Sequence, residues 1–431
     1  MQPQRSYHIE HIWLNRLSEI PEWATQQKGN YLVFWWKDMA IGHIYIEPHQ
    51  SLPTAAFREK VKTAILPCLE FYWQKAPQIA ENWQQGFLQG PLEEWKAFMD
   101  NLLKAWLPQE VPNRVPVSVV ICTRNRPALL EKCLVQLQNL TCLPEEIIVV
   151  DNAPCDDASQ QVVQQFKNAT YVREPRPGLD FARNSGVFKA SCPVIAFVDD
   201  DVTVHPLWIY RVWETFQNPM VEAMTGLVLA AKLETEAQQI FEKHWSFNRG
   251  YVDKFYDSHF FNATLHKGPP VWDIGAGANM AFRKSVFKNV GYFDELLDVG
   301  AAGCNGDSEM WFRILSKGHI IHFNPRAVVH HEHRSDLEGL KNQIYYYLRG
   351  FTVAALKQQK LVPTAGYNRQ LFKRLPIHFT KYIIKGFPHY PFQYKTLWVE
   401  IKGVASGLAF YAKNRKRFDH STPQHHENTS Q

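Results

Sequence analysis

Several features are scarce or missing in this chain of 431 residues, and each absence narrows what the protein can be. No apolar run reaches the ~18 residues that a membrane-spanning helix needs. The N-terminal residues lead into no apolar segment of the kind that a secretory signal carries. Cysteine occurs seven times, an odd number, and never as a Cys-x-x-Cys pair. This usage argues against a disulfide framework or a zinc site and favours reduced thiols in a cytoplasmic protein.

Acidic residues are nearly absent from one segment near the C-terminus. Between Arg369 and Arg417 the chain has 11 Lys and Arg but a single acidic residue, although the whole chain carries only +5. Apolar residues recur there at helical spacing, at Trp398, Ile401, Val404, Ala405 and Leu408. A basic amphipathic helix predicts an anionic membrane as partner, so we expect peripheral binding at the inner face of a membrane and no nucleic acid. A solvated helical face is the alternative.

The pattern along the chain predicts four regions. Residues 1–112 are expected to form a small α+β accessory unit, with strands at 31–36 and 41–46 joined as a hairpin and helices at 55–73 and 92–106. Residues 335–417 read as a helical, basic extension, and 418–431 as a disordered tail. Because every candidate ligand residue follows Val115, we expect the accessory unit to be dispensable for ligand binding.

Residues 113–334 alternate apolar strands with helical patterns. Strands at 117–121, 147–150 and 194–198 are separated by helices, and a polar, aromatic stretch at 232–270 is expected to be a flexible or helical insertion. This alternation predicts a Rossmann-like α/β fold, with a mostly parallel sheet and helices on both faces. Such sheets bind ligands at the carboxyl ends of their strands, so the residues after each strand are the informative ones.

Three carboxylates, Asp199, Asp200 and Asp201, follow the third of these strands. Adjacent carboxylates repel one another, and Mg²⁺ or Mn²⁺ with a substrate phosphate relieves that repulsion. Asp199 and Asp201 point to the same side of an extended backbone, so both are candidate metal ligands. A solvated acidic turn is the alternative.

Other polar residues fall at equivalent places. Thr123, Arg124 and Asn125 follow the first strand, and Asp151 follows the second, where a nucleotide would lie. In the segment from Gly178 to Gly186, Arg183 is a candidate for binding phosphate, or else a helix-capping arginine.

Two later motifs add a candidate base and a candidate metal ligand. Asp307 begins an apolar helical stripe and is either a general base or a helix cap, whereas Glu309 lies four residues before Arg313 and is suited to pair with it. Three histidines, His330, His331 and His333, follow an apolar strand, and one of them can complete a metal site with Asp201. The choice among the three stays open.

Together these motifs resemble the family 2 glycosyltransferases of bacterial type, which have the GT-A fold, over about residues 115–335. The resemblance implies that the Asp199–Asp201 triplet binds the metal and the nucleotide-sugar diphosphate, that Asp151 binds the base, and that Asp307 is the catalytic base. It also implies a metal-binding role for His331 and an acceptor-side loop containing Gly277 and Asn279, with Glu309 close by. One departure is Gly306, where the family usually has Glu.

The resemblance predicts an inverting, metal-dependent transfer from a nucleotide-sugar, most readily a UDP-sugar, to a saccharide or lipid-linked acceptor. Such an activity would serve surface polysaccharide or glycolipid synthesis. Two alternatives remain. A nucleotidyltransferase would need a glycine-rich phosphate loop, which is missing after the first strand, and an inactive sugar-nucleotide-binding scaffold would not need both Asp201 and Asp307.

Overall fold

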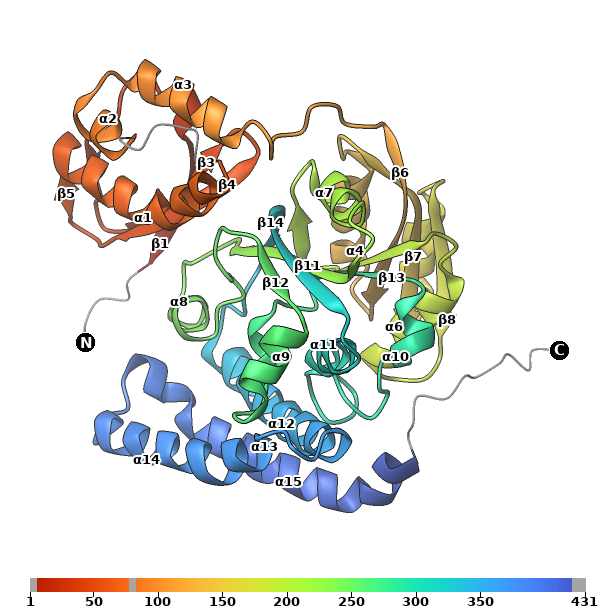
Figure 1. The fold of residues 1–431 in the computed structure, drawn as a ribbon. Coiled ribbons are helices and arrows are strands. Elements are labelled where there is room, and N and C mark those ends of the chain that lie inside the picture. The colour runs from red at the N-terminus through yellow and green to blue at the C-terminus, as the bar shows by residue number, and fades with distance from the viewer. Residues whose placement is uncertain (1–5, 77–82, 421–431) are drawn as a thin grey trace.

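A computed structural model describes residues 6–76 and 83–420, and it divides along the chain into an N-terminal unit, a central sheet domain and C-terminal helices (Figure 1). The expected hairpin is present, because Lys37 takes a left-handed turn conformation between two antiparallel strands. Three helices cover this sheet around a shared apolar core. The elements of the unit are β1 (Tyr7–Trp13), β2 (Trp23–Ala24), β3 (Gly29–Trp36), β4 (Met39–Ile46), β5 (Ser51–Leu52), α1 (Thr54–Gln74), α2 (Trp83–Gln89) and α3 (Leu92–Leu103).

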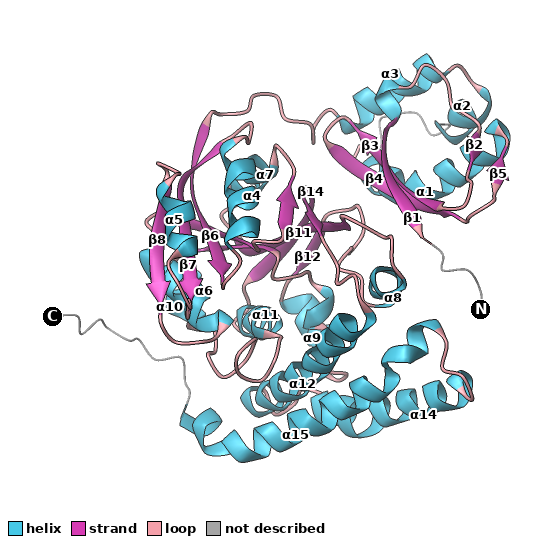
Figure 2. Cartoon of the chain, turned by 180° about the vertical axis from the view of Figure 1, so that it is seen from behind, coloured by secondary structure: helices cyan, strands magenta, loops and turns pink. Residues whose placement is uncertain are grey.

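The central domain is built on a nine-stranded sheet, seen between helices in Figure 2. Its order is β8 (Ala169–Glu174), β7 (Leu143–Asn152), β6 (Arg114–Thr123), β9 (Val194–Val198), β13 (Asn279–Arg283), β11 (Val221–Ala230), β14 (Ile320–His331) and β10 (Val202–Val204), with β12 (Lys254–Tyr256) on β14. β13, β10 and β12 pair antiparallel with their neighbours and the other pairs are parallel. The expected Rossmann-like α/β fold, with helices on both faces of the sheet, is confirmed.

Alternation within the strands creates a core on each face of the sheet. Val120 and Ile148 pack on one face, and their neighbours Val119 and Ile147 pack on the other. The first core includes side chains of α6 (Leu179–Lys189), α10 (Val286–Val290) and α11 (Gly306–Ser316), and the second those of α4 (Pro127–Gln138), α5 (Ala158–Gln164) and α7 (Trp208–Thr215). This two-sided burial explains why the strands read as continuous apolar runs.

The segment 232–270 is more ordered than the sequence suggested. It contains α8 (Glu236–His244), β12 and α9 (Ser258–Leu265), so it is part of the sheet domain and not only a helical or flexible insertion. β12 has three residues, too few to show a strand periodicity. Its neighbour Asp253 accepts hydrogen bonds from Arg326 on β14, which fixes the segment through a side-chain contact that sequence patterns do not reveal.

The C-terminal helices are α12 (Leu337–Leu361), α13 (Tyr367–Arg369), α14 (Leu375–Gly386) and α15 (Leu397–His420), with a π-helical turn at Gln370–Arg374. α15 lies tightly on α12, because a Cβ added at Gly403 or Gly407 would come within 2.6 or 2.7 Å of an α12 carbonyl oxygen. Val404 of the expected membrane-facing stripe packs inside, and Trp398 is exposed. α15 also extends past residue 417, so the predicted disordered tail begins inside this helix, and 421–431 lie outside the described residues.

No helix among the described residues combines the length and apolarity needed to cross a membrane. All seven cysteines are free thiols, in agreement with the sequence analysis.

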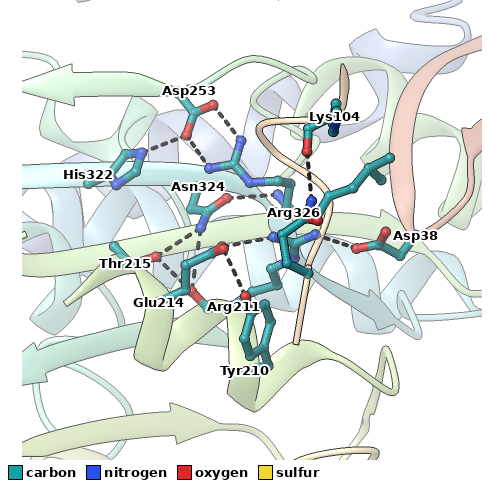
Figure 3. Close-up of polar contacts among 12 residues, drawn as sticks. Asp38, Lys104, Tyr210, Arg211, Glu214, Thr215, Asp253, His322, Asn324 and Arg326 are labelled. Atoms are coloured by element: carbon teal, nitrogen blue, oxygen red, sulfur yellow. Dashed lines mark hydrogen bonds and ion pairs between the residues drawn. The ribbon is translucent and has the colours of Figure 1, made fainter. Parts of the chain in front are cut away.

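The N-terminal unit is fixed to the sheet domain by buried charges (Figure 3). Arg211 on α7, fully buried, forms ion pairs with Asp38 of the N-terminal hairpin and with Glu214. Arg326 on β14 donates to the Tyr72 hydroxyl of α1 at 3.1 Å. The unit therefore neutralises and covers polar groups that belong to the central domain.

Candidate active site

A cavity of about 2420 Å³ opens where the parallel strands end. Its walls come from the ends of β6 and β9, from α6 and α11, and from α12, α14 and α15 of the C-terminal helices. Most of the predicted site residues line it, namely Thr123, Arg124, Arg183, Asp199, Asp200, Asp201, Gly277, Asp307 and His331. The topology thus brings together residues that are up to 208 positions apart.

The three carboxylates after β9 have different surroundings. Asp200 is buried and anchored, since Thr123 Oγ1 donates to its Oδ2 at 2.7 Å and Arg126 Nη1 to its Oδ1 at 3.0 Å. Asp199 and Asp201 line the cavity, and Arg126 Nη1 donates to Asp201 Oδ2 at 3.4 Å. Burial and the charge of Asp201 raise the pKa of Asp199 to about 7. Unbalanced negative charge of this kind is what a divalent cation relieves.

The histidines after β14 are separated by the alternation of the strand. His331 Nε2 lies 3.9 Å from Asp201 Oδ1, whereas His330 faces away and packs against His11 of the N-terminal unit. His333 is buried, 2.9 Å from Glu242 Oε2. Of the three, only His331 is placed to share a cation with Asp201.

Asp199, Asp201 and His331 provide part of the ligand set that Mg²⁺ or Mn²⁺ needs. Two carboxylates and one imidazole suit these ions, which usually take their remaining ligands from water and substrate phosphate. Within the described residues no three His, Cys, Asp or Glu side chains are already arranged around a metal position. A cation at this position would need ligands beyond these three side chains.

Arg183 stands between these carboxylates and the candidate base. Its Nη1 donates to Asp180 Oδ1 at 2.9 Å and to Asp298 Oδ2 at 2.6 Å, and it is 5% exposed. Desolvation opposes its charge, but four carboxylates outweigh it and raise the pKa of Arg183; Asp307 and Asp199 are among them. Arg183 is an internal counter-ion of the acidic cavity, not a helix cap.

Asp307 lies in the first turn of α11, after Asn305 at the N-cap. Its Oδ1 accepts from the Ser308 amide at 2.7 Å, and burial raises its pKa. Gly277 packs against it, because a Cβ at Gly277 would be 3.1 Å from Asp307 Oδ2. A carboxylate on the cavity wall with a raised pKa is suited to accept a proton.

Gly306, the departure from the family pattern, has a steric explanation. A Cβ at this position would collide with the carboxylate oxygens of Asp180 and Asp298. These two buried acids already occupy the space beside the helix start, so a glutamate at 306 does not fit.

Two predicted acceptor-side residues are corrected by the structure. Asn279 is 1% exposed on β13, where its Nδ2 donates to the carbonyls of Leu227 and Ala327 and its Oδ1 accepts from Trp208. Glu309 is 1% exposed and pairs with Arg313 at 2.8 Å and Lys357 at 3.1 Å. Both side chains make internal hydrogen bonds or ion pairs, and neither lines the cavity. Asn125 is exposed and accepts from the Cys155 amide at 3.1 Å, which makes it a turn residue.

Asp151 is fully buried at the end of β7, behind the cavity wall formed by Asn152. Its Oδ2 accepts from the Tyr171 hydroxyl at 3.1 Å, and its Oδ1 is a buried oxygen without a hydrogen-bond partner in the described part of the chain. Burial raises its pKa. Ser159 also hydrogen-bonds this carboxylate, and Asp151 itself does not line the cavity.

Several residues that line the cavity were not predicted from the sequence. Asp298 follows no strand and occupies a loop whose contact with Arg183 depends on the fold. Arg249 and Trp245 lie in the segment treated as an insertion, and Tyr347 lies in the C-terminal extension. Their only sequence signal was the concentration of aromatic residues in these segments.

Comparison with known proteins identifies the region that carries the site. Residues 118–291 match the model for glycosyl transferase family 2. The pre-mycofactocin glycosyltransferase of Mycobacterium tuberculosis is 25% identical over 232 residues, which is 53% of this chain and 45% of that protein. Glycosyltransferase AglE of Haloferax volcanii is 26% identical over 235 residues, 53% of this chain and 70% of the relative.

Succinoglycan biosynthesis protein ExoM of Rhizobium meliloti is 26% identical over 250 residues, 53% of this chain and 72% of the relative. Among solved structures, a mannosyltransferase of Pyrobaculum calidifontis is 19% identical with a TM-score of 0.38, over 74% of this chain and 84% of that one. The chain spans about half the length of the mycobacterial relative. The central region, with its carboxylates after β9 and β7, therefore belongs to glycosyl transferase family 2.

Proposed function

We propose that this protein transfers a sugar from a nucleotide-sugar donor to an acceptor hydroxyl. The observation that carries the proposal is the placement of Asp199, Asp201 and Asp307 on one cavity, around the buried guanidinium of Arg183. A donor diphosphate with its cation fits beside Asp199 and Asp201, and an acceptor hydroxyl fits beside Asp307.

The environment of Asp151 favours uracil as the base. Tyr171 and Ser159 both hydrogen-bond the carboxylate, which leaves room for no more than one N–H donor of a base. Uracil presents one imide N–H, whereas guanine presents two adjacent N–H groups that call for both oxygens. A UDP-sugar is therefore the donor that we propose.

Asp199, Asp201 and His331 would hold Mg²⁺ or Mn²⁺ with the donor diphosphate. When bound, the cation supplies charge stabilisation for the departing diphosphate. Arg183 balances the acids around the cavity, and Asp307 takes the proton of the attacking hydroxyl. With Asp307 as the base and the nucleoside diphosphate as the leaving group, the transfer is a one-step displacement that inverts the anomeric carbon.

We also propose that the C-terminal helices dock on an anionic membrane, through α14 and the turn before it. Phe372, Ile384 and Phe387 are 59%, 71% and 73% exposed there, next to the exposed Lys381 and Lys385. Exposed apolar groups interleaved with cations fit the boundary of an anionic bilayer. Leu375 and His378 of the same helix line the cavity, so a lipid-linked acceptor could enter from this side. Succinoglycan synthesis, named for one relative, is consistent with polysaccharide or glycolipid assembly.

The test is a panel of nucleotide-sugars incubated with the full chain and Mn²⁺ or Mg²⁺. Release of free nucleoside diphosphate from a UDP-sugar, lost when EDTA is added, is the expected result. A protein that binds UDP but releases nothing with any donor and a broad acceptor mixture would instead be a sugar-nucleotide-binding scaffold. Release of pyrophosphate from a nucleoside triphosphate and a sugar phosphate would indicate a nucleotidyltransferase.

A further inference from the structure

Arg249 lies in the loop between α8 and β12, and its side chain lines the cavity. Its Nη1 donates to the Ser246 carbonyl at 2.6 Å and its Nη2 to the Trp272 carbonyl at 2.9 Å. Its Nε is buried and has no hydrogen-bond partner among the residues that the structure describes. The guanidinium is thus held in place by two backbone oxygens, which use two of its five N–H donors.

The charge of Arg249 is balanced only at longer range, because Asp273, Asp307 and Glu242 act on it without an ion pair in the described part of the chain. Each of the four arginines that are less than a tenth exposed has an Asp or Glu within 4.0 Å, and these are Arg183, Arg211, Arg313 and Arg326. Across residues 6–76 and 83–420, no such ion pair is found for Arg249. Burial lowers its pKa. A partly exposed cation whose acids lie beyond ion-pair distance keeps positive charge that an anionic ligand would neutralise.

The position of Arg249 is on the acceptor side of the cavity. The Trp272 carbonyl that it binds belongs to a short turn, Val271–Asp273, that leads into the loop of Gly275 and Gly277. Gly277 is packed against Asp307, the candidate base. The guanidinium is therefore tied to the wall that carries the base, whereas Asp199 and Asp201 follow β9.

Aromatic rings surround this position. Trp245 lies 6.5 Å from Tyr347, and Trp272 lies 5.1 Å from Phe351, as ring centroids, and all four residues line the cavity. An apolar, aromatic wall with one fixed polar group is typical of a specific small-ligand site. The flat rings suit the apolar faces of sugar rings.

The N-terminal unit holds the Arg249 loop from outside. Tyr251 hydroxyl lies 2.7 Å from His43 Nδ1 and accepts from Asn248 Nδ2 at 3.1 Å. Cys68 Sγ lies 3.3 Å from the Tyr251 carbonyl oxygen. Both His43 and Cys68 belong to the N-terminal unit, so this unit fixes Tyr251, two residues after Arg249.

We propose that Arg249 binds an anionic group, a carboxylate or a phosphate, on the acceptor saccharide and so determines which acceptors are used. The inference rests on the proposed glycosyl transfer and adds the chemical class of the acceptor. A guanidinium fixed by two carbonyls offers a preorganised donor for such an oxyanion. The aromatic wall holds the sugar ring, and Arg249 selects its charged substituent.

Binding of three matched probes to the full chain, with Mg²⁺ and UDP present, tests this inference. The probes are p-nitrophenyl β-D-glucoside, the corresponding glucuronide and the glucoside 6-phosphate, which differ at one carbon, and saturation-transfer NMR gives their affinities. We expect one anionic probe to bind about 10- to 100-fold more tightly than the neutral one, as for a hydrogen bond to a charged group. Whichever anion is preferred shows whether the acceptor group is a carboxylate or a phosphate.

Arg249→Gln should abolish that preference, and Arg249→Lys should restore part of it. Arg283→Gln is the matched control, because Arg283 also binds only backbone carbonyls and lies outside the cavity lining. Equal affinity of the wild type for all three probes, or an equal loss for all three in Arg249→Gln, overturns the inference. UDP affinity measured on the same samples separates the outcomes, since absent UDP binding would count against the proposed function itself.

Discussion

At the scale of single residues, Asp201 and Asp307 are expected to fail in different ways when each is changed to Asn. Asp201 faces the cation position, so its loss should weaken UDP binding and the response to Mn²⁺ together. Asp307 is proposed to act on the acceptor proton, so its loss should lower turnover by about 10²–10⁴-fold and spare UDP affinity. Calorimetry with Mn²⁺ and transfer rates measure both effects.

Glu309→Gln would not test whether Glu309 is the base instead, because Glu309 is paired with Arg313 and Lys357 inside the core. Near-normal turnover of Asp307→Asn would remove Asp307 as the base. Normal UDP binding and metal response in Asp201→Asn would make the triplet after β9 a solvated turn.

Asp253 should make folding stability depend on acid pH. Burial opposes its charge, but Arg326 and His322 overcome this and hold its pKa well below the usual ~3.9. A depressed folded pKa stabilises the protein above the unfolded pKa, and this contribution is lost as pH falls toward the folded pKa. Urea unfolding of wild type and Asp253→Asn between pH 3 and 7 should show a large difference at neutral pH that narrows below about pH 4. A difference that stays constant would contradict the assignment.

At the scale of elements, the apolar and basic face of α14 should decide membrane binding. Replacing Lys373, Lys381 and Lys385 by Gln should lower partitioning onto anionic vesicles by about 100-fold, at ~1 kcal/mol for each cation. Ile384→Asp with Phe387→Ser should weaken binding to neutral and anionic vesicles alike. Vesicle flotation gives both results.

Met220→Asp is the matched control for these substitutions, because Met220 is 65% exposed but lies outside the C-terminal helices. Equal flotation of the wild type with neutral and anionic vesicles would remove the electrostatic part of the proposal. Loss of flotation in the Met220 variant would mean that membrane binding does not depend specifically on α14.

At the scale of the whole molecule, the N-terminal unit is structurally coupled to the site domain. A chain starting at Asn113 would leave Arg211 without Asp38 and Arg326 without Tyr72, and would free the loop that carries Arg249. The structure thus gives the opposite expectation to the sequence, which suggested that residues 1–112 are dispensable. Such a chain should be poorly folded, and its melting curve and UDP affinity measure this. Cooperative unfolding of the shortened chain, with the same UDP affinity as the full-length protein, would instead support the view that residues 1–112 are dispensable.

A point substitution tests the same coupling without removing a domain. Asp38→Asn leaves the buried Arg211 with one carboxylate in place of two, which should cost about 1–3 kcal/mol of unfolding free energy. Its neighbour Lys37 pairs with Asp100 in an exposed contact, so Lys37→Gln should cost less than about 1 kcal/mol. Denaturant unfolding compares the two.

Local sequence determined the fold class and much of the candidate site. Strands such as β6 and β9 are apolar runs followed by polar residues, and hydrophobic periodicity depends only on neighbouring positions. Because parallel strands all end at one edge, the order of the motifs was enough to gather Thr123, Asp201 and Asp307 around one cavity. The same reasoning placed the hairpin of the N-terminal unit and the helices of the extension.

Tertiary structure alone decided how each of those side chains is used. Asn279 and Glu309 had suitable chemistry and position in the sequence, yet the Ala327 carbonyl and the Lys357 ammonium, from other elements, bind these side chains internally. Strand alternation and the packing of the N-terminal unit selected His331 over His330, and the shape of the cavity brought Arg249 to its wall. These outcomes depend on contacts between residues far apart along the chain, and no local pattern encodes which partner a buried polar group will meet.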